Sequence, residues 1–154
     1  MTQERVDCAL AASRSVVALS HICSTDVNDA LQLQTISPSA LAYLGDAVYE
    51  LYVRSCYLLP PKRSQLYHRL VVAQVRAEAQ ALHLQFLTPH LTNTELEIVR
   101  RGRNAATKPP KRVDAEIYQQ ASSLETLIGY LYLTDYQRLT QLLQKLEFEP
   151  VDES

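Results

Sequence analysis

Hydrophobic residues recur at helical spacing along most of the chain, and no segment shows the period-two alternation of a half-buried strand. The clearest helical stripe consists of Leu41, Leu44, Val48 and Leu51. The pattern predicts helices over about residues 37–58, 64–87, 92–102, 114–133 and 136–147. We therefore expect an all-α fold.

Capping and helix-breaking residues set the expected boundaries of these helices. Ser37 precedes Pro38, a proline at a first helical position, where its missing N–H is harmless. Prolines end the first two helices, Thr92-x-x-Glu95 is a capping box, and Asp114 and Asp135 can cap the last two. Gly102 is expected to close the third helix as a left-handed C-cap.

The same pattern divides the chain into three parts. Residues 1–36 form an extension with weak periodicity, in which one short helix over 8–22 is the only candidate element. Residues 37–148 form one helical domain, and residues 149–154 form a frayed tail.

Composition excludes several classes of protein. Of 154 residues, 47% are hydrophobic and only three are glycine, which excludes collagen-like and wholly disordered chains. The apolar stretches are too short to span a membrane, and acidic residues stand where a signal peptide would be basic. Three cysteines without a C-x-x-C pair predict neither a disulfide framework nor a zinc site, and the four histidines lack metal-ligand spacing. We expect a cytoplasmic protein.

The charge is segregated along the chain. Residues 54–112 contain 11 of the 15 Lys and Arg residues and only three acids, a net charge of +8, although the whole chain has a net charge of −2. Residues 100–112 contain six cations and no acid, with Asn104 and Thr107 as neutral donors. Gly102 and Pro109-Pro110 predict that this segment is an extended loop, which suits contact with a phosphate backbone. A solvated loop without a partner is the alternative.

Two carboxylates stand apart from the other acids. Asp46 follows Gly45 in the middle of a helix, and Glu125 is the only charge in residues 124–133, with Gly129 one turn later. Glycine inside a helix is unfavourable, so a close approach of two helices at these glycines would explain both. Asp46 and Glu125 would then converge.

Two acids in a partly dry site favour a shared proton or a divalent cation. Hard oxygen ligands favour Mg²⁺ or Mn²⁺, which can activate water and stabilise charge on a phosphate. Two other interpretations are open. Ser122-x-x-Glu125 also matches a capping box, and Asp46 with Glu50 can face water or pair with arginines.

These segments carry a family resemblance. Leu44-Gly-Asp-Ala-Val48 resembles the signature helix of ribonuclease III, and residues 124–133 resemble its second catalytic helix. Together with Arg100-Arg-Gly-Arg-Asn-Ala105, they are similar to Mini-ribonuclease III, the bacterial branch that consists of the nuclease domain alone. Full-length ribonuclease III has acids at the positions of Ser39, Ala42 and Ser122, and the Mini branch shares their loss.

The resemblance implies a homodimer that cleaves double-stranded RNA with Mg²⁺, for which Mn²⁺ can substitute, and that leaves 5′-phosphate ends. It implies precursor 23S ribosomal RNA as the substrate, and the short apolar stretches predict no membrane partner. Asp46 and Glu125 would be the catalytic and metal-binding residues, with Glu50 in a supporting role. The expected RNA contacts are Arg101, Arg103, Asn104, Lys108, Lys111 and Arg112. The missing acids keep two alternatives open, a non-catalytic RNA-binding or ribosome-associated protein and a helical adaptor.

Overall fold

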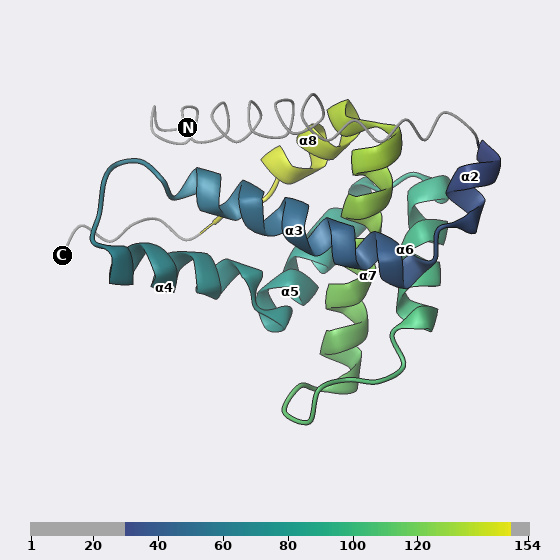
Figure 1. Ribbon diagram of the computed structural model, residues 1–154, viewed down its shortest axis with the longest axis horizontal. Coiled ribbons are helices and arrows are strands. Elements are labelled where there is room, and N and C mark those ends of the chain that lie inside the picture. Colours follow the sequence, from purple (N-terminus) through teal and green to yellow (C-terminus); the bar gives the residue numbers. More distant parts are fainter. Residues whose placement is uncertain (1–29, 149–154) are drawn as a thin grey trace.

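The computed structural model describes residues 30–148, and every regular element in that range is a helix (Figure 1). The expectations for residues 8–22 and 149–154 lie outside the described residues. The helices are α2 (Ala30–Thr35), α3 (Pro38–Cys56), α4 (Ser64–Val75), α5 (Ala77–Leu87), the short 3₁₀ helix η1 (Thr88–His90), α6 (Asn93–Ala105), α7 (Ala115–Thr134) and α8 (Tyr136–Gln144). The predicted all-α fold is confirmed.

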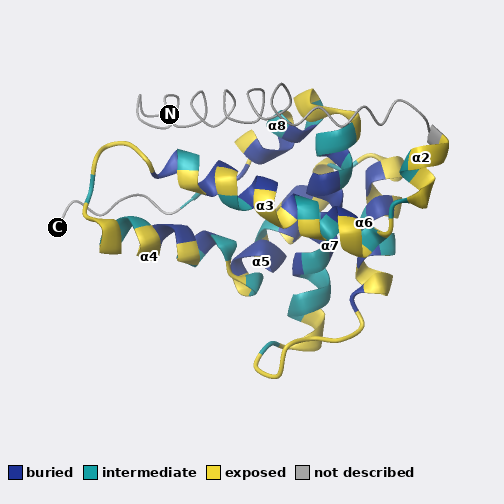
Figure 2. Ribbon diagram, viewed as in Figure 1, coloured by how far each residue is buried: buried dark blue, intermediate teal, exposed yellow. Residues whose placement is uncertain are grey.

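Helix α7 is the centre of the fold. It contacts α3, α5, α6 and α8, and Figure 1 shows α3 crossing in front of it. Leu124, Leu127, Ile128 and Leu131 of α7 are all at most 3% exposed, as expected for a helix that is apolar on nearly every side. Buried residues are concentrated where α3 and α7 cross (Figure 2).

The predicted caps form at the helix starts. The side chain of Ser37 accepts a hydrogen bond from the amide of Ala40 at 3.1 Å. Thr92 and Glu95 make both bonds of the capping box. Asp114 and Asp135 accept backbone amides at the starts of α7 and α8. These side chains satisfy amides that have no partner within the helix, which explains why the four starts were predictable.

The buried face of α3 is rotated from the predicted stripe. Leu41 and Val48 are buried, but Leu44 is only partly buried and Leu51 is 37% exposed. The buried residues instead lie at helical spacing around Gly45, and they are Leu41, Val48, Tyr49, Tyr52, Val53 and Cys56. Because Gly45 faces α7, the buried face of α3 is centred on this glycine rather than on the predicted leucine stripe.

One long helix was expected over residues 64–87, and this expectation is wrong. Arg76 is extended, with φ −65° and ψ 153°, and separates α4 from α5. No proline or glycine marks the break, and arginine is a good helix former, so local propensity contains no signal for it. The break turns α5 back against α7.

The expected end of the third helix at Gly102 is also wrong. Helix α6 continues to Ala105, and no described glycine has a positive φ. Gly102 is buried against α7, where an added Cβ would lie 2.5 Å from Thr126 Oγ1 and 3.2 Å from Ser123 Cα. Its lack of a side chain serves helix packing rather than a left-handed cap.

None of the helices within residues 30–148 has the length and hydrophobicity needed to cross a membrane.

Candidate active site

The crossing of α3 and α7 is a contact between backbones. A Cβ added at Gly45 would overlap the carbonyl oxygen of Glu125 and lie 2.8 Å from the amide nitrogen of Gly129. A Cβ at Gly129 would overlap the carbonyl oxygen of Leu41 and lie 3.2 Å from the amide nitrogen of Gly45. The predicted approach at these two glycines is therefore confirmed.

This crossing brings Asp46 and Glu125 together, although they are far apart in the sequence. Asp46 immediately follows Gly45 on α3, and Glu125 lies one turn before Gly129 on α7. Both carboxylates line the same two adjoining pockets, of about 280 Å³ and 220 Å³. The pair thus lies where the pockets meet, with solvent space on either side.

Burial and a neighbouring negative charge oppose the ionisation of each carboxyl. Burial, and then the charge of Asp46, raise the pKa of Glu125 to about 7, while a hydrogen bond from the Gln80 side chain partly lowers it. The pKa of Asp46 is also raised, first by burial and then by the charge of Glu50. The site therefore concentrates negative charge at a cost that a bound cation would offset.

One alternative interpretation of these acids is wrong, and the other holds in part, because Asp46 is exposed to solvent and Glu50 pairs with Arg54. Helix α7 begins at Ala115, so Ser122 is in its interior and Ser122-x-x-Glu125 is not a capping box. Among the ion pairs of the described residues, none involves Asp46 or Glu125.

Glu50 is placed differently. It lies one turn after Asp46, but its Oε1 accepts from Arg54 at 3.1 Å from Nε and 2.5 Å from Nη2. Glu50 lines neither pocket. Its expected supporting role stays a prediction, and any such role would be exerted through its charge on Asp46.

The three positions at which full-length ribonuclease III has further acids all line the larger pocket. They are Ser39 and Ala42 on α3 and Ser122 on α7. These small side chains leave space beside the two remaining carboxylates. Within residues 30–148 no group of three or more His, Cys, Asp or Glu is placed to hold a metal ion.

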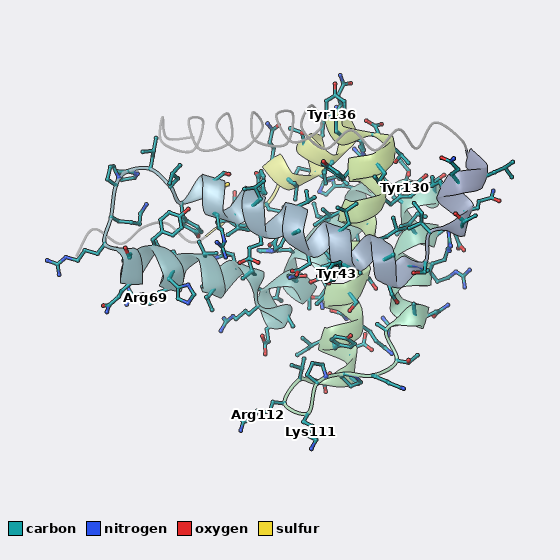
Figure 3. All side chains as sticks on the ribbon, viewed as in Figure 1. Tyr43, Arg69, Lys111, Arg112, Tyr130 and Tyr136 are labelled. Atoms are coloured by element: carbon teal, nitrogen blue, oxygen red, sulfur yellow. The ribbon has the colours of Figure 1, made fainter. Side chains whose placement is uncertain are left out.

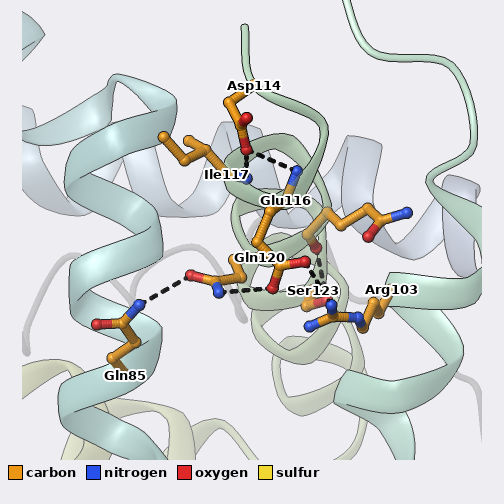
Figure 4. A network of polar contacts seen from close by, with 8 residues as sticks. Gln85, Arg103, Asp114, Glu116, Ile117, Gln120 and Ser123 are labelled. Carbon is orange, nitrogen blue, oxygen red and sulfur yellow. Dashed lines mark hydrogen bonds and ion pairs between the residues drawn. The ribbon is translucent and has the colours of Figure 1, made fainter.

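The basic segment is part helix and part loop, contrary to the extended loop expected over residues 100–112. Arg101, Arg103 and Asn104 belong to the last turns of α6, and the cations Lys108, Lys111 and Arg112 lie in the following loop. Arg103 is paired with Glu116 of α7 at 2.6 Å, within a polar network that also includes Gln120 and Gln85 (Figure 4).

The loop of residues 106–113 connects this basic segment to the carboxylates. Pro110 and Val113 of the loop line the smaller pocket together with Asp46 and Glu125. Lys111 and Arg112 are exposed and project outward from the tip of the loop (Figure 3). The loop therefore places cations beside one end of the acidic site.

Two residues of the pockets were not singled out by sequence reasoning. Tyr118 of α7 lines both pockets, and Gln80 of α5 lines the smaller one together with Glu125. Gln80 reaches the site because of the break at Arg76. Its one sequence signal is a polar residue between the buried Ala79 and Ala81.

Comparison with known proteins gives consistent results. Residues 39–136 match the Ribonuclease III domain family. The chain is 62% identical over 119 residues to a Mini-ribonuclease 3 of Synechocystis sp., covering 77% of this chain and 83% of that protein. It is 50% identical over 115 residues to a Mini-ribonuclease 3 of Gloeobacter violaceus, covering 75% and 85% of the two chains.

A solved structure agrees with the fold. A crystal structure of a protein from Fusobacterium nucleatum superposes with a TM-score of 0.64 at 28% identity, covering 73% of this chain and 95% of that one. The matched family domain contains both Asp46 and Glu125. The chain therefore belongs to the ribonuclease III family of endoribonucleases and, within it, to the Mini-ribonuclease 3 group.

Proposed function

We propose that this endoribonuclease cleaves double-stranded RNA with Mg²⁺, which Asp46 and Glu125 hold at the meeting point of the two pockets. The observation that carries the proposal is the convergence of these carboxylates at the Gly45–Gly129 crossing. Large-subunit precursor ribosomal RNA, the 23S precursor, is the substrate that the family resemblance favours.

The donor set suits this ion. Mg²⁺ is commonly bound through one or two carboxylates together with water and substrate phosphates, because it gives up its water reluctantly. Asp46 and Glu125 supply two hard oxygen donors, and Mn²⁺, which prefers similar ligands, would substitute. The raised pKa values of both acids support the proposal, since a cation would replace a proton as the partner of the pair.

The reaction follows from these positions. When bound, a divalent ion acidifies water and stabilises charge on a phosphate. Asp46 and Glu125 must both be ionised to hold it, and Tyr118, Ser39 and Ser122 shape the surrounding pocket. A water oxygen forms a bond to phosphorus as the bond to O3′ breaks. The water gives up its proton and O3′ gains one, which leaves 5′-phosphate and 3′-hydroxyl ends.

The basic surface beside the site supports a duplex substrate. A-form RNA is recognised mainly through its backbone and shape rather than through its base edges. The loop cations Lys108, Lys111 and Arg112 would contact phosphates next to the scissile bond, and Arg101, Asn104 and Arg103 would extend this contact along α6. Because Arg103 already pairs with Glu116, we expect its contribution to be smaller.

Neutralising the loop should weaken binding through lost phosphate contacts. The Lys108→Gln, Lys111→Gln and Arg112→Gln triple variant is expected to reduce the slope of log affinity against log salt by about 3, since each neutralised phosphate contributes about 0.9. Titrations of an RNA duplex at several salt concentrations measure this slope. Lys145→Gln, at the end of α8, is the control and should leave it unchanged. An unchanged slope in the triple variant would favour the adaptor alternative.

Exposed apolar residues along α3 and the turn after it support the homodimer. Tyr43 is 86% exposed (Figure 3). Leu51, Leu58 and Leu59 are exposed on the same helix and the turn after it. A second copy of this chain covering them would remove apolar surface from water. The proposed dimer would sediment at twice the mass of the chain, which can be measured on the preparation used for activity.

Incubation with a long RNA duplex tests the function. We expect cleavage with Mg²⁺, none with a chelator, and little cleavage of single-stranded RNA of the same sequence. The ends of the products should accept ligation as 5′-phosphates. Binding of the duplex without cleavage would instead support the non-catalytic RNA-binding alternative, which Ser39, Ala42 and Ser122 in place of acids would explain.

A further inference from the structure

The two pockets share more than the acidic pair, Asp46 and Glu125. Two further residues line both pockets, and they are Tyr118 and Ser122 of α7. Tyr118, Ser122 and Glu125 follow one another at intervals of four and three residues, so they share one face of the helix. The meeting point of the pockets therefore carries two neutral hydroxyl groups beside the two carboxylates.

The start of α7 places Tyr118 between the basic loop and the acidic pair. Its backbone amide donates to the carbonyl of the N-cap residue Asp114 at 2.9 Å, so Tyr118 belongs to the first turn of the helix. Pro110 and Val113, which precede this cap, line the smaller pocket together with Tyr118. Glu125 follows two turns later, about 10 Å along the helix axis. An RNA strand that runs from the loop cations to the acidic pair would therefore pass Tyr118.

The hydroxyl group of Tyr118 is not used by the fold. The side chain is partly buried, and within residues 30–148 it makes no hydrogen bond, ion pair or ring contact. Other hydroxyls of α7 do serve the helix, since Ser123 donates to the carbonyl of Gln119 at 2.6 Å and Thr126 to that of Ser122 at 2.7 Å. The Tyr118 hydroxyl is thus left in the pockets as a free donor.

A phosphate oxygen is the ligand that such a donor suits. Tyrosine hydroxyls are among the groups that contact phosphates in nucleic-acid complexes. Mg²⁺ is bound through carboxylates, phosphates and water, so a neutral phenol is not expected to be a metal ligand. A lysine or arginine at this position would pair with the carboxylates and compete with the cation for them. A neutral donor avoids this competition.

We propose that Tyr118 is a substrate-binding residue, whose hydroxyl donates a hydrogen bond to a phosphate oxygen of the RNA strand at the metal site. This inference rests on the proposed metal-dependent cleavage of RNA. The contact holds the strand in position beside the ion and leaves the charge of Asp46 and Glu125 free for the metal. Its acceptor is charged, which makes the hydrogen bond stronger than one between neutral groups.

The first test compares Tyr118→Phe with Tyr136→Phe. Tyr118→Phe removes only the hydroxyl, and we expect it to lower kcat/KM for an RNA duplex about 10- to 100-fold, as the loss of a hydrogen bond to a charged group does. Mn²⁺ affinity without RNA, followed by electron paramagnetic resonance, should not change. Tyr136 is an exposed tyrosine at the start of α8 that lines neither pocket, and Tyr136→Phe should leave both values unchanged.

Modified substrates identify the atom that Tyr118 contacts. In one series of duplexes, a methyl group replaces one non-bridging oxygen at a single phosphate near the cleavage site. At one position this replacement should lower the activity of the wild type at least about 10-fold more than that of Tyr118→Phe, in which the contact is already absent. A second series with single 2′-deoxy nucleotides should affect the two proteins equally, because it removes the ribose hydroxyl and keeps the phosphate.

Wild-type kcat/KM in Tyr118→Phe would overturn the inference, and so would equal sensitivity of the two proteins at every phosphate. Weaker Mn²⁺ binding or a failure to fold in Tyr118→Phe would show that the hydroxyl serves the metal site or the fold, and would overturn it as well. A difference confined to a 2′-deoxy position would show that the ribose is the ligand instead. Wild-type protein that does not cleave the duplex with Mg²⁺ would contradict the proposed function itself.

Discussion

Glu125→Gln should reduce the Mg²⁺-dependent cleavage of an RNA duplex by at least about 10³-fold, which corresponds to about 4 kcal/mol of lost transition-state stabilisation. The amide keeps the shape of the side chain but removes the charge that would hold the ion. Asp46→Asn should have an effect of the same size. Single-turnover rates at saturating protein measure both, so that a change in RNA affinity does not enter.

The controls for this prediction are other acids. Glu97→Gln, on an exposed face of α6 where Glu97 pairs with Arg100, should cleave at the wild-type rate. Glu50→Gln tests the supporting role of Glu50, and a decrease of about tenfold or less would separate it from a metal ligand. Mg²⁺-dependent cleavage by both purified variants, Asp46→Asn and Glu125→Gln, would contradict the site assignment.

Stability should change in the opposite direction to activity in Glu125→Gln. The ordinary pKa of the glutamate is 4.5, and the folded protein raises it to about 7. The folded state therefore binds the Glu125 proton more tightly than the unfolded state does. This tighter binding stabilises the fold fully below about pH 4.5, and the stabilisation is lost as the pH rises through about 7. Without metal, thermal unfolding of the wild type should occur at a lower temperature at pH 8 than at pH 5.5. Glu125→Gln should lose less stability over this interval.

Gly45→Ala and Gly129→Ala should each lower the free energy of unfolding by about 3 kcal/mol, near the upper end of the usual cost of overpacking. In each case the new methyl group would overlap a backbone carbonyl of the facing helix, and backbone cannot move aside as a side chain can. The higher helix propensity of alanine would offset only about 0.5–1 kcal/mol of this loss in unfolding free energy. Urea unfolding of the purified variants measures the difference.

Gly102→Ala provides a milder substitution with which the stability losses of Gly45→Ala and Gly129→Ala can be compared. Its nearest atom is Oγ1 of the Thr126 side chain, although Ser123 Cα also lies 3.2 Å away. We expect a smaller loss than at Gly45 or Gly129. Unfolding of the Gly45 and Gly129 variants at the wild-type urea concentration would show that α3 and α7 do not meet backbone to backbone.

The convergence of Asp46 and Glu125 was predictable because the sequence features that indicate it lie close to each carboxylate. A glycine inside a helix is unfavourable unless something approaches closely, and Gly45 and Gly129 each stand beside a carboxylate in an otherwise apolar segment. Gly102 shows the limit of this reasoning. The same residue type also suits a helix end, and only the packing against Thr126 and Ser123 decides between the two.

The break at Arg76 could not be predicted in this way. The residues around it favour a continuous helix, and what accompanies the break is a side-chain bond from Gln80 to Val75 and the packing of α5 against α7, neither of which helix propensity describes. Gln80 therefore remained outside the predicted site. The loop cations were predicted as a group, but their separation from the helical Arg101 and Arg103 depends on where α6 ends.

The most direct test of the account is the position of Mn²⁺ in crystals of the protein, located by anomalous scattering. The account predicts a peak within bonding distance of carboxylate oxygens from both Asp46 and Glu125. The same protein must cleave RNA duplex when Mn²⁺ replaces Mg²⁺. A peak that contacts neither residue, in crystals of cleavage-competent protein, would contradict the assignment of these two carboxylates as the metal site.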